Sequence, residues 1–564
     1  MYRLFWHFLS VGSMVSFIIF IFSIFLVIVK KKVSKKVWRI LCFVPLIISI
    51  IHFIVYFVPN YFIISRFLFM YVFSIFILLL QFIYNKEKIF KFSSIIIIIL
   101  GFISFFMTFY GTIMDENIHN LNYYSYTDSF NKTISILKKE YVLNEHKKID
   151  YDKLYSKYYP LIEQAEKNND EQLYFKTMFE FSKNFKDGHF YYGIYYTNLE
   201  ETAKRYSFIN EYNNRDYGFG TVLLTDGRVA AIFVKENSEA YNKGLRDGMI
   251  ITKKDNRDIH DVLNEIITPN QPYPVLEDEM LLDSFYLFST GNDLVEVSFL
   301  NEENEEITIT VQSIDDSQLT RPDEMYNKIM YYDYELENLE TKMLDNNTGY
   351  IYVSDEMYSP FKGAIGYLLD DSSYLTKIVD EKLQNLISQG MTNLIIDLRA
   401  NSGGYMTESE AIASLFTNDN YLVSKDAKYN SNLYDKSYLK GNGKYSNMNI
   451  TILVNSDTAS AGDCLTYMFS KMPNAKIVGF TNSNNSAQSV GGIILLSGGT
   501  SYISYPIYKS LDSNNRILID TDSTRIANVR LDYRINLTQE NIKEIFYSDE
   551  DYDYLLNFAL QMIE

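Results

Sequence analysis

Long apolar runs occupy the first hundred positions of the chain, and shorter, interrupted runs fill the rest. Four stretches near the N-terminus are each mostly apolar, and they extend over residues 4–29, 40–58, 61–84 and 93–113. A helix needs about 20 apolar residues to cross the ~30 Å hydrocarbon core of a bilayer. The pattern therefore predicts a four-helix transmembrane domain at residues 1–114, and it does not fit a single short secretory signal.

The basic residues between these stretches predict how the helices are oriented. Lysines cluster between the first and second stretches and again between the third and fourth, whereas residues 59 and 60, between the second and third, carry no charge. Basic loops stay on the cytoplasmic side of a membrane. We therefore expect a multi-pass protein of the cell membrane, with everything after residue 113 on the extracytoplasmic side.

Beyond residue 114 the apolar positions follow three successive patterns. Residues 115–205 place apolar side chains at helix-like intervals. Residues 206–315 alternate apolar and polar positions in short runs separated by glycines, as strands and turns do. Residues 316–564 alternate strand-like with helix-like runs, which is typical of an α/β core. The pattern thus predicts three further domains after the transmembrane one.

Charge and composition exclude several classes of function. Residues 1–114 contain eleven Lys or Arg and one Glu, whereas the remaining chain contains 41 basic and 69 acidic residues. Such an acidic part argues against nucleic-acid binding, which requires a basic face. The two cysteines, Cys42 and Cys464, provide no disulfide framework. The sequence has no Walker loop, CxxC pair or HExxH pattern, so it implies no metal and no cofactor.

A serine-containing turn joins a predicted strand to a predicted helix. The apolar run 450–454 is followed by Thr458-Ala459-Ser460-Ala461-Gly462-Asp463 and then by a helix-like run. A serine at this point lies beside unpaired N–H groups, at the positive end of a helix dipole. That position suits a nucleophile whose oxyanion must be stabilised. An ordinary helix N-cap fits the same local pattern, so the turn alone leaves both interpretations open.

A second motif changes this balance. Leu394-Ile395-Ile396-Asp397-Leu398-Arg399-Ala400-Asn401-Ser402-Gly403-Gly404 is a strand-like run that ends in a polar, double-glycine turn. Glycine pairs bring backbone N–H groups close to a ligand. The two motifs, in this order and some fifty residues apart, resemble the tail-specific, or C-terminal processing, serine peptidase family. Weaker similarities extend the resemblance over roughly residues 120–560.

The resemblance implies a fold for each part of the chain. It implies an α-helical cap at 115–205, a PDZ-like β-rich domain at 206–315, and an α/β core of the ClpP/crotonase-like kind at 316–564. With the all-α transmembrane bundle, the expected fold class is multi-domain. Within the PDZ-like segment, Gly218, Phe219 and Gly220 are candidates for binding a peptide terminus through backbone N–H groups beside a strand edge. An ordinary β-turn fits these three residues equally well.

The resemblance also implies catalytic residues. It makes Ser460 the nucleophile, with an oxyanion hole formed by the N–H of Ala461 and an N–H from Gly403 or Gly404. Much of the family places a lysine base about 25 residues after the serine, but this chain has Asn485 there.

The tricorn-like branch of the family uses a histidine from the helical cap instead. His189, in Lys186-Asp187-Gly188-His189-Phe190, is the candidate for that role. A histidine acts as a base near neutral pH with little tuning. A third residue should orient it, and the branch uses a glutamate about sixty residues after the serine. Asp520 and Asp522 are the nearest carboxylates, although a solvated loop accounts for each of them as well.

Together these features predict a membrane-anchored, extracytoplasmic serine endopeptidase that hydrolyses peptide bonds of proteins through an acyl-enzyme. The expected partners are a protein or peptide substrate and the lipid bilayer, without nucleic acid, and the oligomeric state is left open. The family lysine and glutamate are missing. A catalytically inactive peptide-binding receptor on the same scaffold is therefore the alternative.

Overall fold

The computed structural model describes residues 117–195, 203–314, 321–330, 336–345, 347–359, 373–431, 434–549 and 552–563. Among these residues, no helix combines the length and the apolar character that a membrane crossing requires. The longest, α6 (Tyr151–Asn168), has 18 residues but carries charged side chains along its exposed face. This finding corrects the predicted all-α transmembrane bundle and the predicted multi-pass localisation in the cell membrane. The four apolar stretches on which both rested lie outside the described residues.

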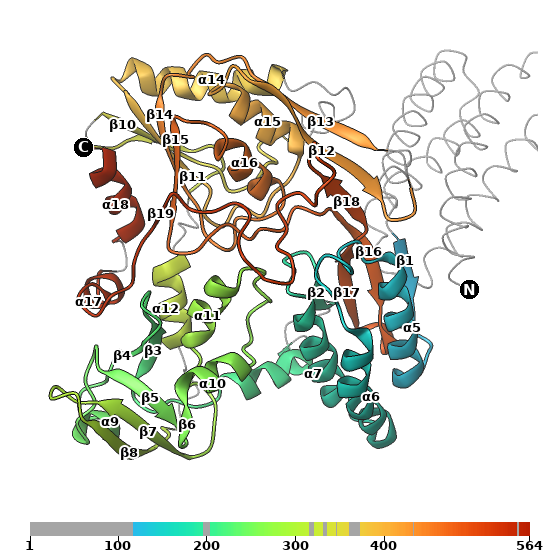
Figure 1. Cartoon of the computed structure of the whole chain (residues 1–564), viewed down its shortest axis with the longest axis vertical. Helices are drawn as coiled ribbons and strands as arrows, with labels where there is room; N and C mark the ends of the chain where they lie inside the picture. Colours follow the sequence, from blue (N-terminus) through green and yellow to red (C-terminus); the bar gives the residue numbers. More distant parts are fainter. Residues whose placement is uncertain are drawn as a thin grey trace, which may run out of the picture. The chain divides into compact units, whose positions relative to one another are not determined.

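Three α-helices from residues 126–182 and a four-stranded sheet form a first region of the described chain (Figure 1). The side chains of Ser125, Asp150 and Asp170 cap the helix N-termini by accepting backbone N–H groups, as short polar residues do. The sheet has the order β1-β16-β17-β2. These elements are α5 (Tyr126–Glu140), α6, α7 (Glu171–Ser182), η1 (Lys183–Phe185), η2 (Tyr206–Tyr212), β1 (Asn117–Asn120), β2 (Tyr191–Ile194), β16 (Val490–Leu495), η3 (Ser497–Gly499) and β17 (Ser501–Pro506).

Residues far apart in the sequence share the core of this region. Ile494 and Ile503, from the hairpin β16–β17, pack in one buried cluster with Phe130 and Phe181 from the helices. The segment before β2 is therefore fixed against the C-terminal half of the chain.

An antiparallel sheet of the order β3-β4-β5-β7-β8, with β6 paired to β5, forms a second region. Short helices flank it, and α11 contacts β3. The elements are β3 (Gly220–Leu223), β4 (Val229–Ile232), α9 (Glu239–Asn242), β5 (Ile250–Lys254), β6 (Arg257–Asp258), α10 (Ile259–Glu265), α11 (Leu276–Ser284), β7 (Leu294–Leu300) and β8 (Glu306–Gln312).

A six-stranded sheet with the order β19-β15-β14-β11-β10-β9 forms the α/β core. All its pairs are parallel except β9 with β10. A small separate sheet, β13-β12-β18, contributes Val423 and Leu439 to the same buried cluster as β11. The elements of this region are α12 (Arg321–Met330), β9 (Thr341–Met343), β10 (Thr348–Tyr352), α14 (Ser373–Ser388), β11 (Asn393–Asp397), α15 (Met406–Ser414), β12 (Asn420–Lys428), β13 (Asp435–Lys440), β14 (Asn449–Leu453), α16 (Ala461–Phe469), β15 (Ala475–Gly479), β18 (Tyr508–Leu511), β19 (Tyr533–Arg534), α17 (Ile542–Phe546) and α18 (Tyr554–Ile563).

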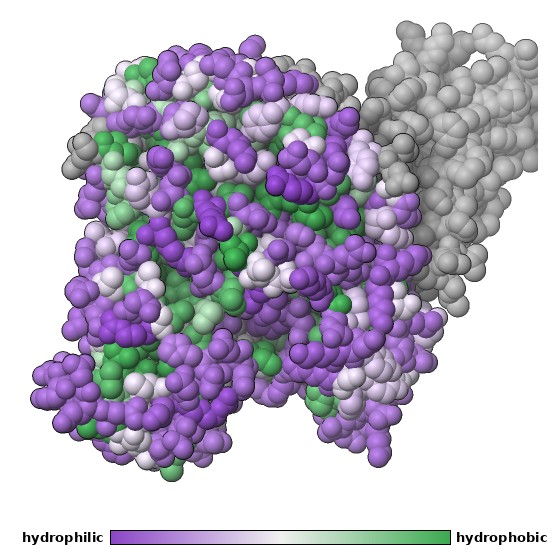
Figure 2. All heavy atoms as spheres, in the orientation of Figure 1, coloured by the Kyte–Doolittle hydropathy of each residue, from purple (hydrophilic) through white to green (hydrophobic). Residues whose placement is uncertain are grey.

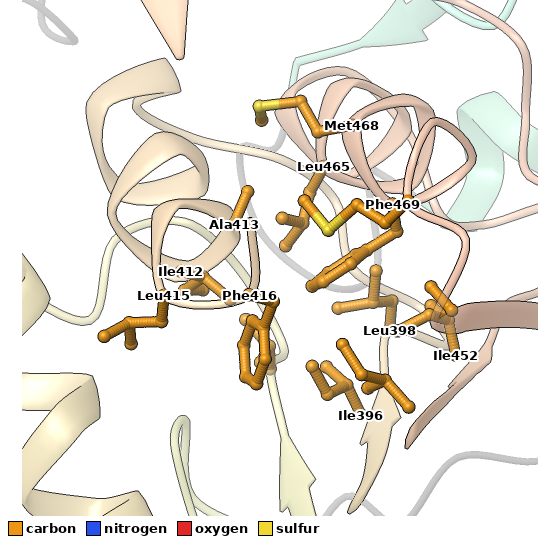
Figure 3. Packing of buried hydrophobic residues seen from close by; sticks show 14 of the residues in the cluster. Ile396, Leu398, Ile412, Ala413, Leu415, Phe416, Ile452, Leu465, Met468 and Phe469 are labelled. Atoms are coloured by element: carbon orange, nitrogen blue, oxygen red, sulfur yellow. The ribbon is translucent and has the colours of Figure 1, made fainter. Parts of the chain in front are cut away.

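Both faces of the parallel sheet are buried, as is usual for parallel strands. Leu394 and Ile396 of β11 belong to the cluster that includes α14, α15 and α16, part of which Figure 3 shows. Ile395, between them, points to the opposite face and packs in the cluster of α12, α17 and α18. On the face that Figure 2 shows, hydrophilic residues predominate. Because the strands are held on both sides, the loops at their carboxyl ends have fixed positions, and two of these loops carry the predicted motifs.

Candidate active site

Ser460 stands at the N-cap position of α16 with a strained backbone. Its φ of 60° and ψ of −119° lie where residues other than glycine are rarely found, at a cost of about 1–3 kcal/mol. A typical N-cap residue has extended backbone, and its side chain accepts a helix N–H. The Ser460 side chain makes no such bond. An ordinary helix cap therefore does not describe this serine, which is half-buried and does not use its hydroxyl to cap α16.

The double-glycine turn packs directly against this serine. Gly403 has a φ of +92°, and a Cβ built on it would lie 2.6 Å from the Cβ of Ser460 and 2.8 Å from the nitrogen of Ala461. Only a glycine allows this approach.

Hydrogen bonds distinguish the two glycines as oxyanion donors. The N–H of Gly403 donates to Asn401 Oδ1 (2.9 Å) and is therefore occupied. The carbonyl of Gly403 accepts the N–H of Glu356 (3.0 Å), so the N–H of Gly404, in the same trans peptide, points the opposite way. Within the described residues, neither Gly404 N–H nor Ala461 N–H donates a hydrogen bond. These two N–H groups, one from the turn of Ser460 and one from the glycine turn that packs against it, are therefore the candidate oxyanion donors.

His189 lies in a turn that a buried carboxylate organises. Asp187 is fully buried, and its Oδ1 accepts the N–H of His189 (2.9 Å) while its Oδ2 accepts the hydroxyl of Tyr141 (2.8 Å). Burial lowers the pKa of the His189 imidazole, and the nearby Asp187 carboxylate opposes this shift. Nδ1 of His189 is buried without a hydrogen-bond partner in the described part of the chain. The imidazole is thus kept in its neutral, basic form over a wider pH range than an ordinary histidine.

The loop 481–488, between β15 and β16, contacts both the turn of Ser460 (residues 458–463, the serine turn) and the turn of His189 (residues 186–190, the histidine turn). The carbonyl of Ser486 accepts the N–H of Ser460 (3.1 Å), and its hydroxyl accepts the N–H of Gly188 (2.9 Å). Asp463 of α16 accepts the N–H groups of Asn485 and Ser486 (2.9 Å each). Two turns that are more than 250 residues apart in the sequence thus meet on one short, buried loop.

Asn485, at the position of the family lysine, is used entirely for structure. Its Oδ1 accepts the N–H groups of Asn528 (2.7 Å) and Val529 (3.0 Å), and its Nδ2 donates to the carbonyl of Ser483 (2.8 Å). The side chain therefore fastens the loop to residues 528 and 529. An amide held in this way supplies no base.

The two candidate aspartates have different surroundings. Asp520 is fully buried, and its Oδ2 accepts the N–H of Ala487 (2.8 Å) and Nε2 of Gln488 (3.0 Å). Burial raises the pKa of its carboxyl well above the usual range. Asp522 instead accepts the hydroxyl (2.6 Å) and N–H of Thr524 in an exposed turn, and these bonds lower its pKa. The structure brings Asp520 to the loop 481–488, whereas Asp522 belongs to a local turn.

Sequence reasoning missed a buried lysine beside this cluster. Nζ of Lys147 donates to the carbonyls of Lys186 (2.8 Å) and Thr521 (3.1 Å), and burial lowers its pKa. It thereby joins the histidine turn to the segment of Asp520. The polar sequence around Lys147 contains no signal of this role.

The residues predicted to bind a peptide terminus are covered. Gly218, Phe219 and Gly220 are buried, and the N–H of Gly218 donates to Asp216 Oδ1 (2.7 Å). Along the outer edge of β3, the N–H of Leu223 donates to Ser284 Oγ of α11 (2.9 Å). In this conformation α11 occupies the strand edge along which a peptide would add.

Comparison with known proteins identifies the core. Residues 361–525 match the model of Peptidase family S41. No curated protein matches the chain. Similar solved structures include mature CPAF complexed with lactacystin (11% identity, 78% of this chain and 98% of that one, TM-score 0.47). They also include the photosystem II D1 C-terminal processing protease (15% identity, 73% of this chain and 93% of that one, TM-score 0.31). A third is a putative peptidase from Parabacteroides merdae ATCC 43184 (14% identity, 78% of this chain and 96% of that one, TM-score 0.40).

The matched segment contains both predicted motifs, with Ser460, Gly403 and Gly404 inside it. The protein is a serine-type peptidase, and residues 361–525 are similar to Peptidase family S41. Its substrates are accordingly proteins or peptides. This confirms the predicted enzyme class, whereas the PDZ-like domain and the histidine-using branch stay predictions.

Proposed function

We propose that the protein is an endopeptidase in which Ser460 is the nucleophile and His189 the general base. The N–H groups of Ala461 and Gly404 stabilise the oxyanion. The observation that carries this proposal is the strained backbone of Ser460 (φ 60°, ψ −119°) at the start of α16, in contact with the glycine turn. A helix cap needs no such strain, whereas a nucleophile presented between two oxyanion donors does.

The chemistry follows from these positions. His189 takes the proton of Ser460 as the Ser460 oxygen attacks the peptide carbonyl, and the carbonyl oxygen becomes an oxyanion between the two N–H groups. His189 then protonates the leaving amine, which leaves an acyl-enzyme on Ser460. A water molecule, deprotonated by His189, releases the acid. Each oxyanion donor contributes about 10²–10³ in rate.

Supporting residues act on the loop and not on the substrate. In this proposal Asp520 fixes Ala487 and Gln488, so that the loop beneath the site keeps its shape. Asp463 has the same role from α16, and burial raises the pKa of its carboxyl to about 7. Asp522, in its exposed turn, has no part in the reaction. The antiparallel sheet β3–β8 supports a PDZ-like domain, with residues 115–205 as the helical cap.

The test uses the full chain and a serine-reactive phosphonate, with the labelled residue identified by mass spectrometry. We expect labelling at Ser460, none in Ser460→Ala, and at least a hundredfold slower labelling in His189→Ala. The matched control is His260→Ala, because His260 is exposed and its imidazole contacts the carbonyl of Gly227 (2.7 Å) and Asp258 Oδ1 (3.2 Å), neither of which belongs to the site. Hydrolysis of an unfolded protein substrate should follow the same order.

Two results would contradict the proposal. Labelling confined to another serine would remove Ser460 from the reaction. Labelling of Ser460 that survives His189→Ala but is lost in Lys147→Met would assign the base to a lysine instead, since Lys147 is the buried lysine that contacts this turn.

A further inference from the structure

Ser486 has three polar groups, of which two bind the start of α16 and the third binds the turn that carries His189. The residue is fully buried in the loop 481–488. Its N–H donates to Asp463 Oδ2 (2.9 Å), which fixes it to the first turn of α16. Its carbonyl accepts the N–H of Ser460 (3.1 Å). The backbone of Ser486 is therefore part of the structure that holds the nucleophile.

The side chain of Ser486 points to the other half of the site. Its Oγ accepts the N–H of Gly188 (2.9 Å), and the same hydroxyl lies 3.5 Å from Asp187 Oδ1 as a donor. That carboxylate oxygen also accepts the N–H of His189 (2.9 Å). The hydroxyl of Ser486 thus contacts both residues that precede His189: it accepts the N–H of Gly188 and donates to the carboxylate of Asp187.

The histidine turn has no room to move toward the loop. A Cβ on Gly188 would collide with Asn484 Oδ1 and would lie 3.0 Å from Ser486 Oγ. The turn is close-packed on that side, against the side chain of Asn484 and against the hydroxyl of Ser486 that accepts the N–H of Gly188.

We propose that Ser486 is a positioning residue, which fixes His189 relative to Ser460 without touching the substrate. This inference rests on the proposed function, because it needs the serine and the histidine to react together. No covalent link restrains these two residues, which come from distant parts of the chain. Their relative position therefore depends on such contacts, and an error of about 1 Å costs roughly a hundredfold in rate.

The test compares Ser486→Ala with Ser456→Ala in the full chain. Ser456 is a matched control because its hydroxyl is also buried but has no hydrogen-bond partner among the described residues. We expect Ser486→Ala to lower kcat by about tenfold to a hundredfold with KM nearly unchanged, since no substrate contact is lost. Ser456→Ala should keep the wild-type values.

A pH profile separates positioning from a general loss of structure. Burial lowers the pKa of His189, so a loosened, better hydrated turn should return that pKa toward its ordinary value. In Ser486→Ala, the acid limb of the phosphonate labelling rate should therefore move to higher pH. If Ser486→Ala does not fold, Ser486→Cys keeps the shape of the side chain, is only slightly larger, and provides a much weaker acceptor. The same changes in kcat and in the pH profile are then expected, but smaller.

The inference is overturned if Ser486→Ala, or Ser486→Cys in its place, matches Ser456→Ala in kcat and in its pH profile. In that case wild-type labelling at Ser460 would still depend on His189, and only the positioning role would be lost. If labelling at Ser460 is absent in the wild type or does not depend on His189, the proposed function itself is wrong.

Discussion

Replacing Gly403 by alanine should lower kcat by about a hundredfold or more while leaving most of the stability of the enzyme intact. A Cβ at this position would lie 2.6 Å from the Cβ of Ser460, 2.8 Å from the nitrogen of Ala461 and 2.9 Å from the carbonyl oxygen of Ala459. Two of the three contacts are with backbone atoms, which cannot turn away as a flexible side chain can. The nucleophile or the glycine turn must therefore shift.

The size of the effect follows from these distances. Restoring an ordinary contact of at least 3.4 Å from 2.6 Å requires a movement of roughly 0.8 Å. A misplacement of about 1 Å costs about a hundredfold in rate, or about 2.7 kcal/mol of activation free energy. In addition, the φ of +92° costs an alanine about 1–2 kcal/mol of folding free energy.

Gly390→Ala is the matched control. Gly390 has a φ of +101°, and an added Cβ there meets nothing within 4 Å. It should therefore carry the same backbone strain without the collision. The assay measures kcat on a protein substrate together with urea unfolding for both variants. Both should lose about 1–2 kcal/mol of unfolding free energy, and only Gly403→Ala should lose about a hundredfold or more in kcat.

The reasoning is refuted if Gly403→Ala and Gly390→Ala have the same kcat. That result would mean that the glycine turn and the serine are not in contact in the active enzyme. A loss of stability in Gly403→Ala well beyond that of Gly390→Ala would show instead that the collision unfolds the core.

Three further predictions test the buried charges. Arg399→Met should lower the free energy of unfolding by about 3–5 kcal/mol in urea denaturation. The reason is that Asp397 and Asp553 would lose the guanidinium that binds both of them (2.5 and 2.6 Å), and a loss below about 1 kcal/mol would contradict this prediction. Burial raises the pKa of Glu356 to about 8, so its contribution to stability should be full below about pH 4.5 and lost as the pH rises to about 8. Glu356→Gln should remove this dependence in unfolding measured over that range, and an unchanged pH dependence would refute it. The acid limb of kcat/KM should lie below the range of an ordinary histidine, because burial lowers the pKa of His189; an acid limb above that range would argue against this base.

Local patterns were sufficient where the chemistry is local. The strand, the turn and the helix around Ser460 follow one another along the chain, so apolar spacing and small residues predicted them. The same holds for the glycine turn, which directly follows the apolar run of β11. The two loops then lie close together because they stand at the carboxyl ends of adjacent parallel strands, β11 and β14. Both loops lie within residues 361–525, the segment that matches the family model.

Local patterns failed where the environment of a residue decides its role. Hydropathy predicted an all-α transmembrane bundle, which the described helices do not support. The sequence made the Gly218 loop a candidate peptide site with an ordinary turn as the alternative, and it gave no sign that Ser284 of α11 bonds the strand beside it. Asp520 and Asp522 are equivalent in the sequence, yet one is buried beneath the loop 481–488 and the other lies in an exposed turn.

By itself, the sequence determined the peptidase motifs, the α/β alternation of the core and the serine at the start of a helix, because these depend on neighbours within a few residues. Only the tertiary structure decided that Ser486 joins the serine turn to the histidine turn, that Asn485 is a structural amide, and that the N–H of Gly403 is bonded to Asn401 whereas that of Gly404 donates to none of the described residues. Each of these depends on which distant backbone groups a side chain or peptide meets, and hydrogen bonding across the fold is not encoded in any local pattern.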